Sequence, residues 1–308
     1  RGNIEYPCGG SIYFENTVAH MNDCSFLNNS IKSDFANAFG AAIYSSDKEL
    51  YIKNSSFMNN IIKDTYSSSY GGAICGENTE FDFQNVSFIN NEIYSAKGSF
   101  GGAIYTLNKK LNLETVLFIN NTAICNNAFS RGGAIYNDKS TGKCINCKFY
   151  NNTAEIFPDS FTSLESEPKS TGGAFHLINV TFNITNCTFD NNTCYGYSLI
   201  LDSTSFGGSI YSTGSNLNFV KSNFFNNTLF NVGSKFDSDF FIEGGACYLL
   251  NTDAKFTECK FISNTASLSI SEKSKYIAAS ACGGAIYSYS NGQFQSLKLT
   301  TEQRMIKI

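Results

Sequence analysis

Apolar and polar positions recur in short blocks about every 31 residues along the chain. Apolar pairs two residues apart stand 10 and 12 residues after a recurring glycine, as at Phe81 and Phe83, and again 15 and 17 residues after it, as at Val86 and Phe88. A spacing of two is the period of a β-strand. Between the pairs the phase slips by one residue, which predicts corners at Asp23, Asn54, Asn85, Thr115, Asn146 and Asn186.

Two sequence boxes mark each repeat. A Gly-Gly-Ala-Ile-Tyr-like box begins at Gly9, Gly40, Gly71, Gly101, Gly132, Gly172, Gly207, Gly244 and Gly283. A Phe-x-Asn-Asn box begins at Phe26, Phe57, Phe88, Phe118, Phe149, Phe189 and Phe224, and Phe261 opens the variant Phe-Ile-Ser-Asn. The first glycine lies 17 residues before its phenylalanine in every complete repeat, whereas the distance on to the next glycine varies from 13 to 23. Each repeat therefore has a half of fixed length and a half that accepts insertions, as in solenoid proteins.

These patterns predict an all-β chain, a right-handed parallel β-helix of about nine coils with three short strands per coil. A third strand covers the glycine box, and helical repeats of similar length need a helical pattern that is absent here. We expect one domain over residues 1–308. The second box is missing after Gly283, so residues 292–308 form either a C-terminal cap or the point where the available sequence ends.

Stacked coils place like residues over like. An Asn ladder is predicted from the residue that closes each Phe-x-Asn-Asn box, namely Asn29, Asn60, Asn91, Asn121, Asn152, Asn192, Asn227 and Asn264. An isoleucine column in the glycine box favours the core. The neighbouring tyrosines then form an outward aromatic stripe, which either covers the sheet or binds carbohydrate or a partner: Tyr13, Tyr44, Tyr105, Tyr136, Tyr211, Tyr248 and Tyr287. The sequence alone leaves open which of the two columns faces inward.

Composition agrees with a strand-rich protein and excludes some partners. The 308 residues include 25 Gly, 28 Phe and 17 Tyr, with 3 Pro and no Trp. Lysine and arginine number 22 against 26 acidic residues, a net charge of −4, which argues against nucleic acid and anionic membranes. No apolar run is long enough to insert into a bilayer. The chain begins at Arg1, as expected of a mature product or a fragment.

The two boxes together resemble the repeat of the polymorphic outer-membrane proteins of chlamydiae, and similar boxes occur in repeat-rich surface proteins of some protists. The resemblance covers about residues 8–290. It implies a right-handed parallel β-helix that is exported, exposed and often adhesive. The motif is specific for the fold and says little about function.

Eleven cysteines raise three questions. Cys24, Cys147, Cys187 and Cys259 stand where other repeats have Ser or Val, which favours a role as small apolar core residues. Cys147 and Cys187 lie on adjacent coils and are candidates for a disulfide, as are Cys125 and Cys194 in the variable segments of an oxidised protein. Cys144 and Cys147 have the spacing of a metal knuckle, but without a second pair or a nearby His we predict no metal site and no cofactor.

Ten Asn-x-Ser/Thr sequons occur, and five of them are simply the repeat motif. The other five are candidates for glycosylation in a eukaryotic secretory pathway: Asn54, Asn85, Asn179, Asn183 and Asn186. The alternative is chance occurrence in a chain rich in Asn, Ser and Thr.

No pattern of converging catalytic residues stands out. Aligned outward strand positions hold one carboxylate, Asp82, and the only two histidines, His20 and His176, fall in different columns. We therefore predict a non-enzymatic extracellular surface or fibre protein for adhesion, spacing or filament assembly, with self-association or other surface proteins as partners. The alternatives are a glycan-binding module that uses the tyrosine stripe, and a β-helical polysaccharide lyase or hydrolase.

Overall fold

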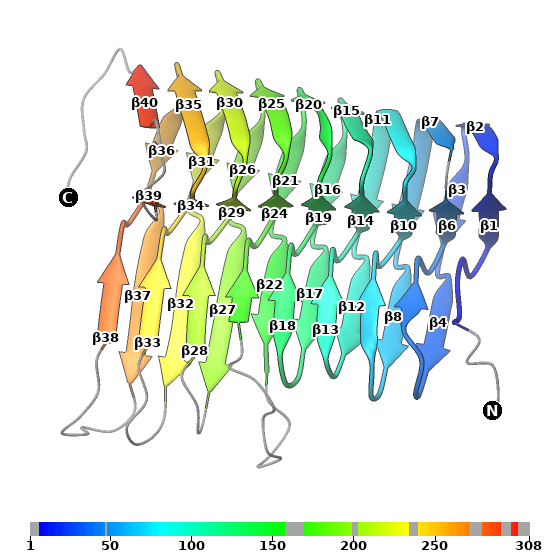
Figure 1. The fold of residues 1–308 in the computed structure, drawn as a ribbon, viewed down its shortest axis with the longest axis horizontal. Helices are drawn as coiled ribbons and strands as arrows, with labels where there is room; N and C mark the ends of the chain where they lie inside the picture. Colours follow the sequence, from blue (N-terminus) through cyan, green and yellow to red (C-terminus); the bar gives the residue numbers. More distant parts are fainter. Residues whose placement is uncertain are drawn as a thin grey trace.

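The repeats fold into successive coils of a parallel β-helix, stacked along one axis from β1 to β40 (Figure 1). The computed structural model describes residues 6–46, 48–157, 169–198, 203–233, 240–270, 279–290 and 297–300. Within these ranges the regular secondary structure is strand throughout, and no helix is long and apolar enough to cross a membrane. The predicted fold class, a parallel β-helix solenoid, is confirmed.

Each coil passes through four parallel sheets, which we number I to IV in the order the chain visits them. Sheet I contains the glycine boxes. Its nine strands are β1 (Ile12–Glu15), β6 (Ile43–Ser46), β10 (Ile74–Glu77), β14 (Ile104–Leu107), β19 (Ile135–Asp138), β24 (Phe175–Ile178), β29 (Ile210–Thr213), β34 (Cys247–Leu250) and β39 (Ile286–Tyr289).

Sheet II has 15 strands in two limbs that meet at the predicted corner, and β7 (Glu49–Met58) and β11 (Glu80–Ile89) run through both limbs. The first limb also has β2 (Val18–Asn22), β15 (Lys110–Glu114), β20 (Thr141–Ile145), β25 (Thr181–Thr185), β30 (Asn216–Val220), β35 (Asp253–Thr257) and β40 (Leu297–Thr300). The second limb has β3 (Ser25–Leu27), β16 (Leu117–Ile119), β21 (Lys148–Tyr150), β26 (Thr188–Asp190), β31 (Asn223–Phe225) and β36 (Lys260–Ile262).

Sheets III and IV occupy the half of the repeat that varies in length. Sheet III contains β4 (Ser30–Ser33), β8 (Ile61–Asp64), β12 (Glu92–Ser95), β17 (Thr122–Cys125), β22 (Thr153–Ile156), β27 (Thr193–Ser198), β32 (Thr228–Gly233) and β37 (Thr265–Ile270). Sheet IV contains β5 (Ala38–Phe39), β9 (Ser68–Tyr70), β13 (Gly98–Phe100), β18 (Phe129–Arg131), β23 (Lys169–Thr171), β28 (Ser203–Phe206), β33 (Phe240–Glu243) and β38 (Ala279–Cys282).

The three predicted strands of each repeat are the sheet I strand and the two limbs of sheet II. The strands of sheets III and IV were not predicted, and the insertions fall between these two sheets, as between β22 and β23. Near the C-terminus, β40 pairs with β35 and extends sheet II, with Leu299 opposite Phe256. The rest of the 292–308 segment lies outside the described residues.

The register of the sheets places identical residues in vertical columns. Phe88 lies opposite Phe57 in one neighbouring coil and Phe118 in the other. The eight box phenylalanines form one column with ring centroids 4.6 to 5.0 Å apart. This column, with the isoleucines of sheet I and the apolar pairs of sheet II, forms the main core. Burial of these apolar side chains is the main stabilising contribution to the coil.

Left-handed backbone produces the corners. Asn54, Asn85, Asn146 and Asn186, together with Thr115, have φ between 49° and 56°, at the positions where the phase slip predicted a turn. Asn adopts this conformation more easily than most residues, and Gly more easily still. At Gly101, where φ is 72°, a Cβ atom would lie 2.0 Å from the Ile104 carbonyl oxygen, so only glycine fits there.

One coil carries unusually small residues inside sheet II. Gly142 lies between Leu111 and Phe182, and Cys144 lies between Leu113 and Ile184. A Cβ atom at Gly142 would come within 2.8 Å of the Phe182 ring, which already fills this space. The small residues therefore leave room beside β20 for large rings and, at Cys144, for neighbouring sulfur atoms.

Candidate functional site

The Asn residues that close the Phe-x-Asn-Asn boxes are brought together in a buried hydrogen-bonded column. Asn91 is typical: its Nδ2 donates to Asn121 Oδ1 at 2.9 Å and to the Phe57 carbonyl at 3.0 Å. Its Oδ1 accepts from both the backbone N–H and the Nδ2 of Asn60. Each buried amide is thus satisfied by its neighbours, which is a structural role.

The five candidate glycosylation residues are exposed, and they differ in how their amides are used. Asn54, Asn85 and Asn186 each donate Nδ2 to an Asn side chain of the preceding coil, at 3.3, 3.0 and 2.8 Å. Asn183 accepts from Asn218 Nδ2 at 3.3 Å, on the outer face of β25. Asn179 lies with φ 51° at the turn before β25. The corner sequons are therefore members of a second, exposed ladder.

The predicted tyrosine stripe lies outside the coil but is mostly covered. The neighbouring isoleucine column faces the core, and its members Ile43 and Ile104 are fully buried. Tyr105, Tyr136 and Tyr248 are only 7 to 8% exposed, and Tyr13 alone, at 53%, has the exposure that a flat binding platform requires. This burial fits the first of the two alternatives, a stripe that covers the sheet, because aromatic side chains at the ends of sheet IV strands pack edge-on against it: Tyr70 on Tyr105, and Phe100 on Tyr136.

His176 takes a tyrosine position in this covered stripe. Its ring stacks between Tyr136 and Tyr211, with centroids 5.0 and 4.6 Å away. Its Nδ1 is 2.8 Å from the Thr171 hydroxyl, and its Nε2 is buried without a hydrogen-bond partner among the described residues. Burial, reinforced by the positive charge of Arg131, holds the pKa of His176 well below its usual value.

Carboxylates gather on the outer face of sheet II at the N-terminal coils. Glu49 and Glu80 lie side by side in register, a pair that was not predicted from the sequence because they stand two residues before the aligned column of Tyr51 and Asp82. Glu80 forms an ion pair with Lys110 Nζ at 2.6 Å, and Glu49 accepts a hydrogen bond from the Tyr51 hydroxyl. Each carboxylate therefore has its own partner on an open strand face.

Cys125 and Cys194 are not placed to form a disulfide. The sequence analysis put them in variable segments, whereas both are buried in sheet III strands, β17 and β27, with β22 between them. Two strand spacings are about 9.6 Å, beyond the Cα separation that a disulfide spans. Cys125 contacts the Ala96 carbonyl, and Cys194 contacts the Ser170 hydroxyl.

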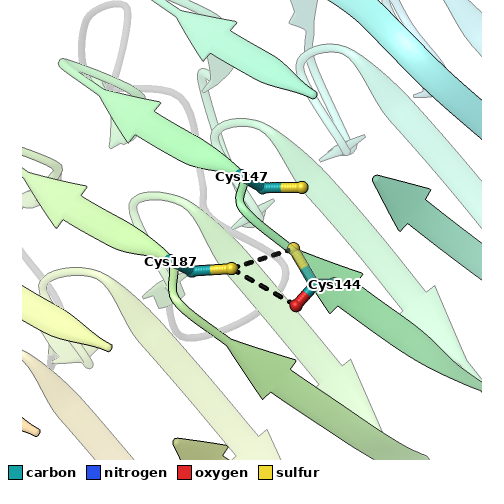
Figure 2. A group of neighbouring side chains, drawn as sticks. All are labelled: Cys144, Cys147 and Cys187. Atoms are coloured by element: carbon teal, nitrogen blue, oxygen red, sulfur yellow. Dashed lines mark hydrogen bonds between the residues drawn. The ribbon is translucent and has the colours of Figure 1, made fainter. Parts of the chain in front are cut away.

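Three other cysteines meet inside the core (Figure 2). Cys144 lies in β20, Cys147 follows the corner of the same coil, and Cys187 follows the corner of the next coil. All three are fully buried, and their Sγ atoms lie within 4.8 Å of one another. The side chains of Cys147 and Cys187 run parallel, with the Cys144 sulfur opposite them. The repeat alignment placed Cys147 beside Cys187, and the sequence spacing linked Cys144 to Cys147, but the meeting of all three sulfurs was not predicted; the three are free thiols here, and no Cys147–Cys187 disulfide is formed.

The thiols of Cys144 and Cys187 are in hydrogen-bonding contact, and Cys147 lies beside them. Cys187 Sγ is 3.6 Å from Cys144 Sγ and donates to the Cys144 carbonyl at 3.3 Å. The Val116 N–H donates to Cys147 Sγ at 3.5 Å. Once Cys187 loses its proton its neighbours can donate to it, and hydrogen bonds from Cys144 and Cys147 lower its pKa, whereas burial raises the pKa of Cys144. Thiols in such contact are suited to bind soft metal ions.

Comparison with known proteins finds one match. Residues 186–213 match the repeat of the Chlamydia polymorphic membrane protein. These residues run from the corner of sheet II through β26, β27 and β28 to the end of β29, so they contain one Phe-x-Asn-Asn box and the glycine box that follows it. Neither a curated protein nor a solved structure matches the chain.

Proposed function

We propose that this chain is a non-enzymatic cell-surface protein, a stiff β-helical segment for adhesion, spacing or assembly outside the cell. The observation that carries the proposal is the match of residues 186–213 to the Chlamydia polymorphic membrane protein repeat. The same box order and spacing recur through the other coils, so the matched segment represents the unit from which the whole β-helix is built. The coils share one continuous hydrophobic core, which supports a mechanical rather than a catalytic role.

The polar outer face supports a non-enzymatic reading. Glu80 is paired with Lys110, and Asp82 accepts from Asn112 Nδ2 at 3.3 Å. General acid–base catalysis needs a protonated and an ionised group that converge on one substrate bond. Partnered carboxylates along an open strand face suit a solvated surface better. Incubation with a panel of acidic and neutral polysaccharides should release no oligosaccharides, and measurable cleavage would establish the lyase or hydrolase alternative.

Cell-surface location is tested with antibodies raised against the folded chain. Intact cells of the source organism should be labelled, and brief protease treatment of intact cells should remove the label. Labelling that requires permeabilised cells would contradict the proposal. For adhesion, beads that carry the folded chain should attach to target cells more than beads that carry the heat-unfolded chain.

Self-association is a further part of this proposal. The first coil presents apolar side chains near its outer edge, where Val18 and Leu27 are about half exposed and Ile12 and Phe14 are only half buried. Exposed strand edges recruit further strands, and head-to-tail contacts propagate into filaments. Light scattering over a hundredfold range of concentration should show a mass that rises above 33.8 kDa. A constant monomer mass would remove this part of the proposal.

Glycan binding is the second candidate, and one observation favours it at a new position. Phe35 is 80% exposed and stacks on Tyr66, which is 55% exposed, with ring centroids 5.0 Å apart. Exposed aromatic faces of this kind stack against sugar rings. Binding to a glycan array that Phe35→Ser and Tyr66→Ser abolish, while Tyr13→Ser retains it, would support this candidate. No binding by the unaltered chain would dismiss it.

Glycosylation stays a proposal for a eukaryotic source. Asn179 and Asn183 donate no hydrogen bond from Nδ2 within the described residues, whereas the corner sequons use this nitrogen in the exposed ladder. Because the glycan is attached at Nδ2, we expect higher occupancy at Asn179 and Asn183 than at Asn54. Peptide mass spectrometry of native protein measures the three occupancies, and equal values would contradict the expected order.

A further inference from the structure

The sulfur cluster of Cys144, Cys147 and Cys187 goes beyond the proposed surface function and does not depend on it. Its three sulfur atoms come from two neighbouring coils and face one point in the core (Figure 2). The three side chains are fully buried, so they are screened from solvent oxidants and from other chains. The question is what such a closed group of thiols can bind.

Simple core filling does not account for the cluster. The corner column that contains Cys147 and Cys187 has Val116 and Ser222 in the flanking coils, so neither position requires sulfur. The column that contains Cys144 has Leu113 and Ile184 beside it. Cysteine also occupies the corner column at Cys24 and Cys259, but only beside Cys147 and Cys187 does the neighbouring column supply a further cysteine, Cys144. A disulfide would join two of the sulfurs and leave the third without a role.

The geometry suits a metal ion. A soft ion bound by thiolates at about 2.3 Å places its sulfur ligands roughly 3.8 to 4.0 Å apart. Here Cys144 and Cys187 are 3.6 Å apart, and all three sulfurs fall within 4.8 Å. Small side-chain rotations therefore bring the three sulfurs to one ion. We propose that Cys144, Cys147 and Cys187 form a three-sulfur binding site for a soft metal ion, with Cu(I) as the best match.

The number and kind of ligands select Cu(I) over Zn(II). Structural zinc takes four ligands, and in the described part of the chain the group contains three ligand residues, all cysteine. Purely sulfur coordination favours soft ions such as Cu(I). Backbone N–H groups offset part of the thiolate charge, as Val116 N–H does at Cys147. Each thiol that becomes a thiolate ligand releases one proton to solvent, so full ligation releases three protons per ion.

The test uses the full chain, purified anaerobically from cells grown with added copper salt. After washing with a Cu(I)-specific chelator, elemental analysis should find about one copper ion per chain. Two variants remove one ligand each and insert residues that the same column already contains, Cys147→Val and Cys187→Ser. The matched control is Cys24→Ser, at the equivalent corner of the first coil. Among the described residues, Cys24 does not belong to the cluster of three cysteines. Thermal melting verifies that all three variants fold.

Competition with chelators of graded affinity gives the decisive comparison. We expect Cys147→Val and Cys187→Ser each to weaken Cu(I) binding at least ~100-fold. Loss of a residue that only hydrogen-bonds to a metal ligand already costs roughly 10–100-fold in affinity, and loss of the ligand itself should cost more. The Cys24→Ser control should bind as the unaltered chain does. X-ray absorption should show a copper ion surrounded by sulfur alone. Equal copper retention in all variants, equal retention of Zn(II) by the unaltered chain, or a Cys144–Cys187 disulfide in native protein would each overturn the proposal.

Discussion

Thr115 holds a corner backbone conformation that its side chain disfavours. Its φ of 55° is left-handed, and a β-branched residue is strained there, by roughly 1–2 kcal/mol. The neighbouring coils use Asn85 and Asn146 at this position. Thr115→Asn should therefore raise the free energy of unfolding by about 1 kcal/mol, and the new amide would lie between those of Asn85 and Asn146 in the exposed ladder. Denaturant melting measures the gain.

A matched control separates backbone strain from the chemistry of the amide. Thr141 is also exposed, but it lies in the extended strand β20. Thr141→Asn makes the same chemical change without a left-handed backbone, and it should give no gain or a small loss. Equal gains at both positions would show that backbone conformation is not the cause.

His176 makes stability depend on pH in a defined direction. Because burial lowers its pKa in the folded state, an unfolded chain with a pKa near 6.5 binds a proton that the folded chain does not. The contribution of neutral His176 to the free energy of unfolding is therefore fully present above about pH 6.5. It falls as the pH decreases below this value, by up to about 1.4 kcal/mol per pH unit. His176→Tyr, the residue of the neighbouring coils, should remove this slope between pH 5 and 6.5 in urea melts. An unchanged slope would assign the effect to other groups.

At the scale of the element, the buried Asn ladder contributes more to the free energy of unfolding than the exposed ladder beside it. Asn121→Ala leaves the Asn91 N–H without its partner and removes one hydrogen bond each from Asn91 Nδ2, the Phe88 carbonyl and Asn152 Oδ1. A buried unpaired group costs about 1–3 kcal/mol and each further hydrogen bond contributes about 0.5–1.5 kcal/mol, so the variant should lose about 3 kcal/mol or more. Asn120→Gly removes only the exposed bond to Asn90 Oδ1, and should change stability by less than about 1 kcal/mol. Equal losses in denaturant melts would contradict the distinction.

Strands could be predicted from the sequence where their inward side chains are large and alternate with polar ones. Strands whose inward side chains are small could not be predicted. Phe118 and Leu113 reveal sheet II through their alternation. In sheets III and IV, some coils place small residues at the inward positions, such as Ala123 and Ser130, both fully buried, where other coils have large residues such as Ile93. The Ser130 hydroxyl donates to the Ala123 carbonyl at 2.7 Å, which satisfies a polar group inside the coil. In the sequence, a buried serine cannot be told from a loop residue. The sequence therefore assigns these strands to the segment of variable length.

The candidate site shows the same limit. Column assignments follow from repeat spacing, and thus the adjacency of Cys147 and Cys187 was available from the sequence. The Cys144 sulfur lies toward Cys147 and Cys187. This orientation depends on the geometry of the corner between the limbs of sheet II, which repeat spacing does not specify. Likewise, the cover over the tyrosine stripe depends on the corner at which the chain passes from sheet IV to sheet I. That corner brings Phe100 against Tyr136 although 36 residues separate them.

At the scale of the whole molecule, stability should vary along the axis because each coil contacts only its neighbours. Central side chains such as Phe88, Phe118 and Phe149 are fully buried between coils. In the first coil Ile12 and Phe14 are only half buried, and Ile286 is half buried in the last glycine box. Such a stack behaves as a one-dimensional chain of coupled units that opens from its ends.

Amide hydrogen exchange can test this gradient and the proposed self-association together. At low concentration, amides of β14, β19 and β24 should exchange slowest and those of β1 and β39 fastest, because only the terminal coils lack a neighbour on one side among the described strands. If coils of separate molecules stack end to end, raising the concentration should slow exchange in β1 and β39 and leave β19 unchanged. A gradient that is independent of concentration would identify a single free rod, and uniform exchange along the axis would show that the coils unfold together.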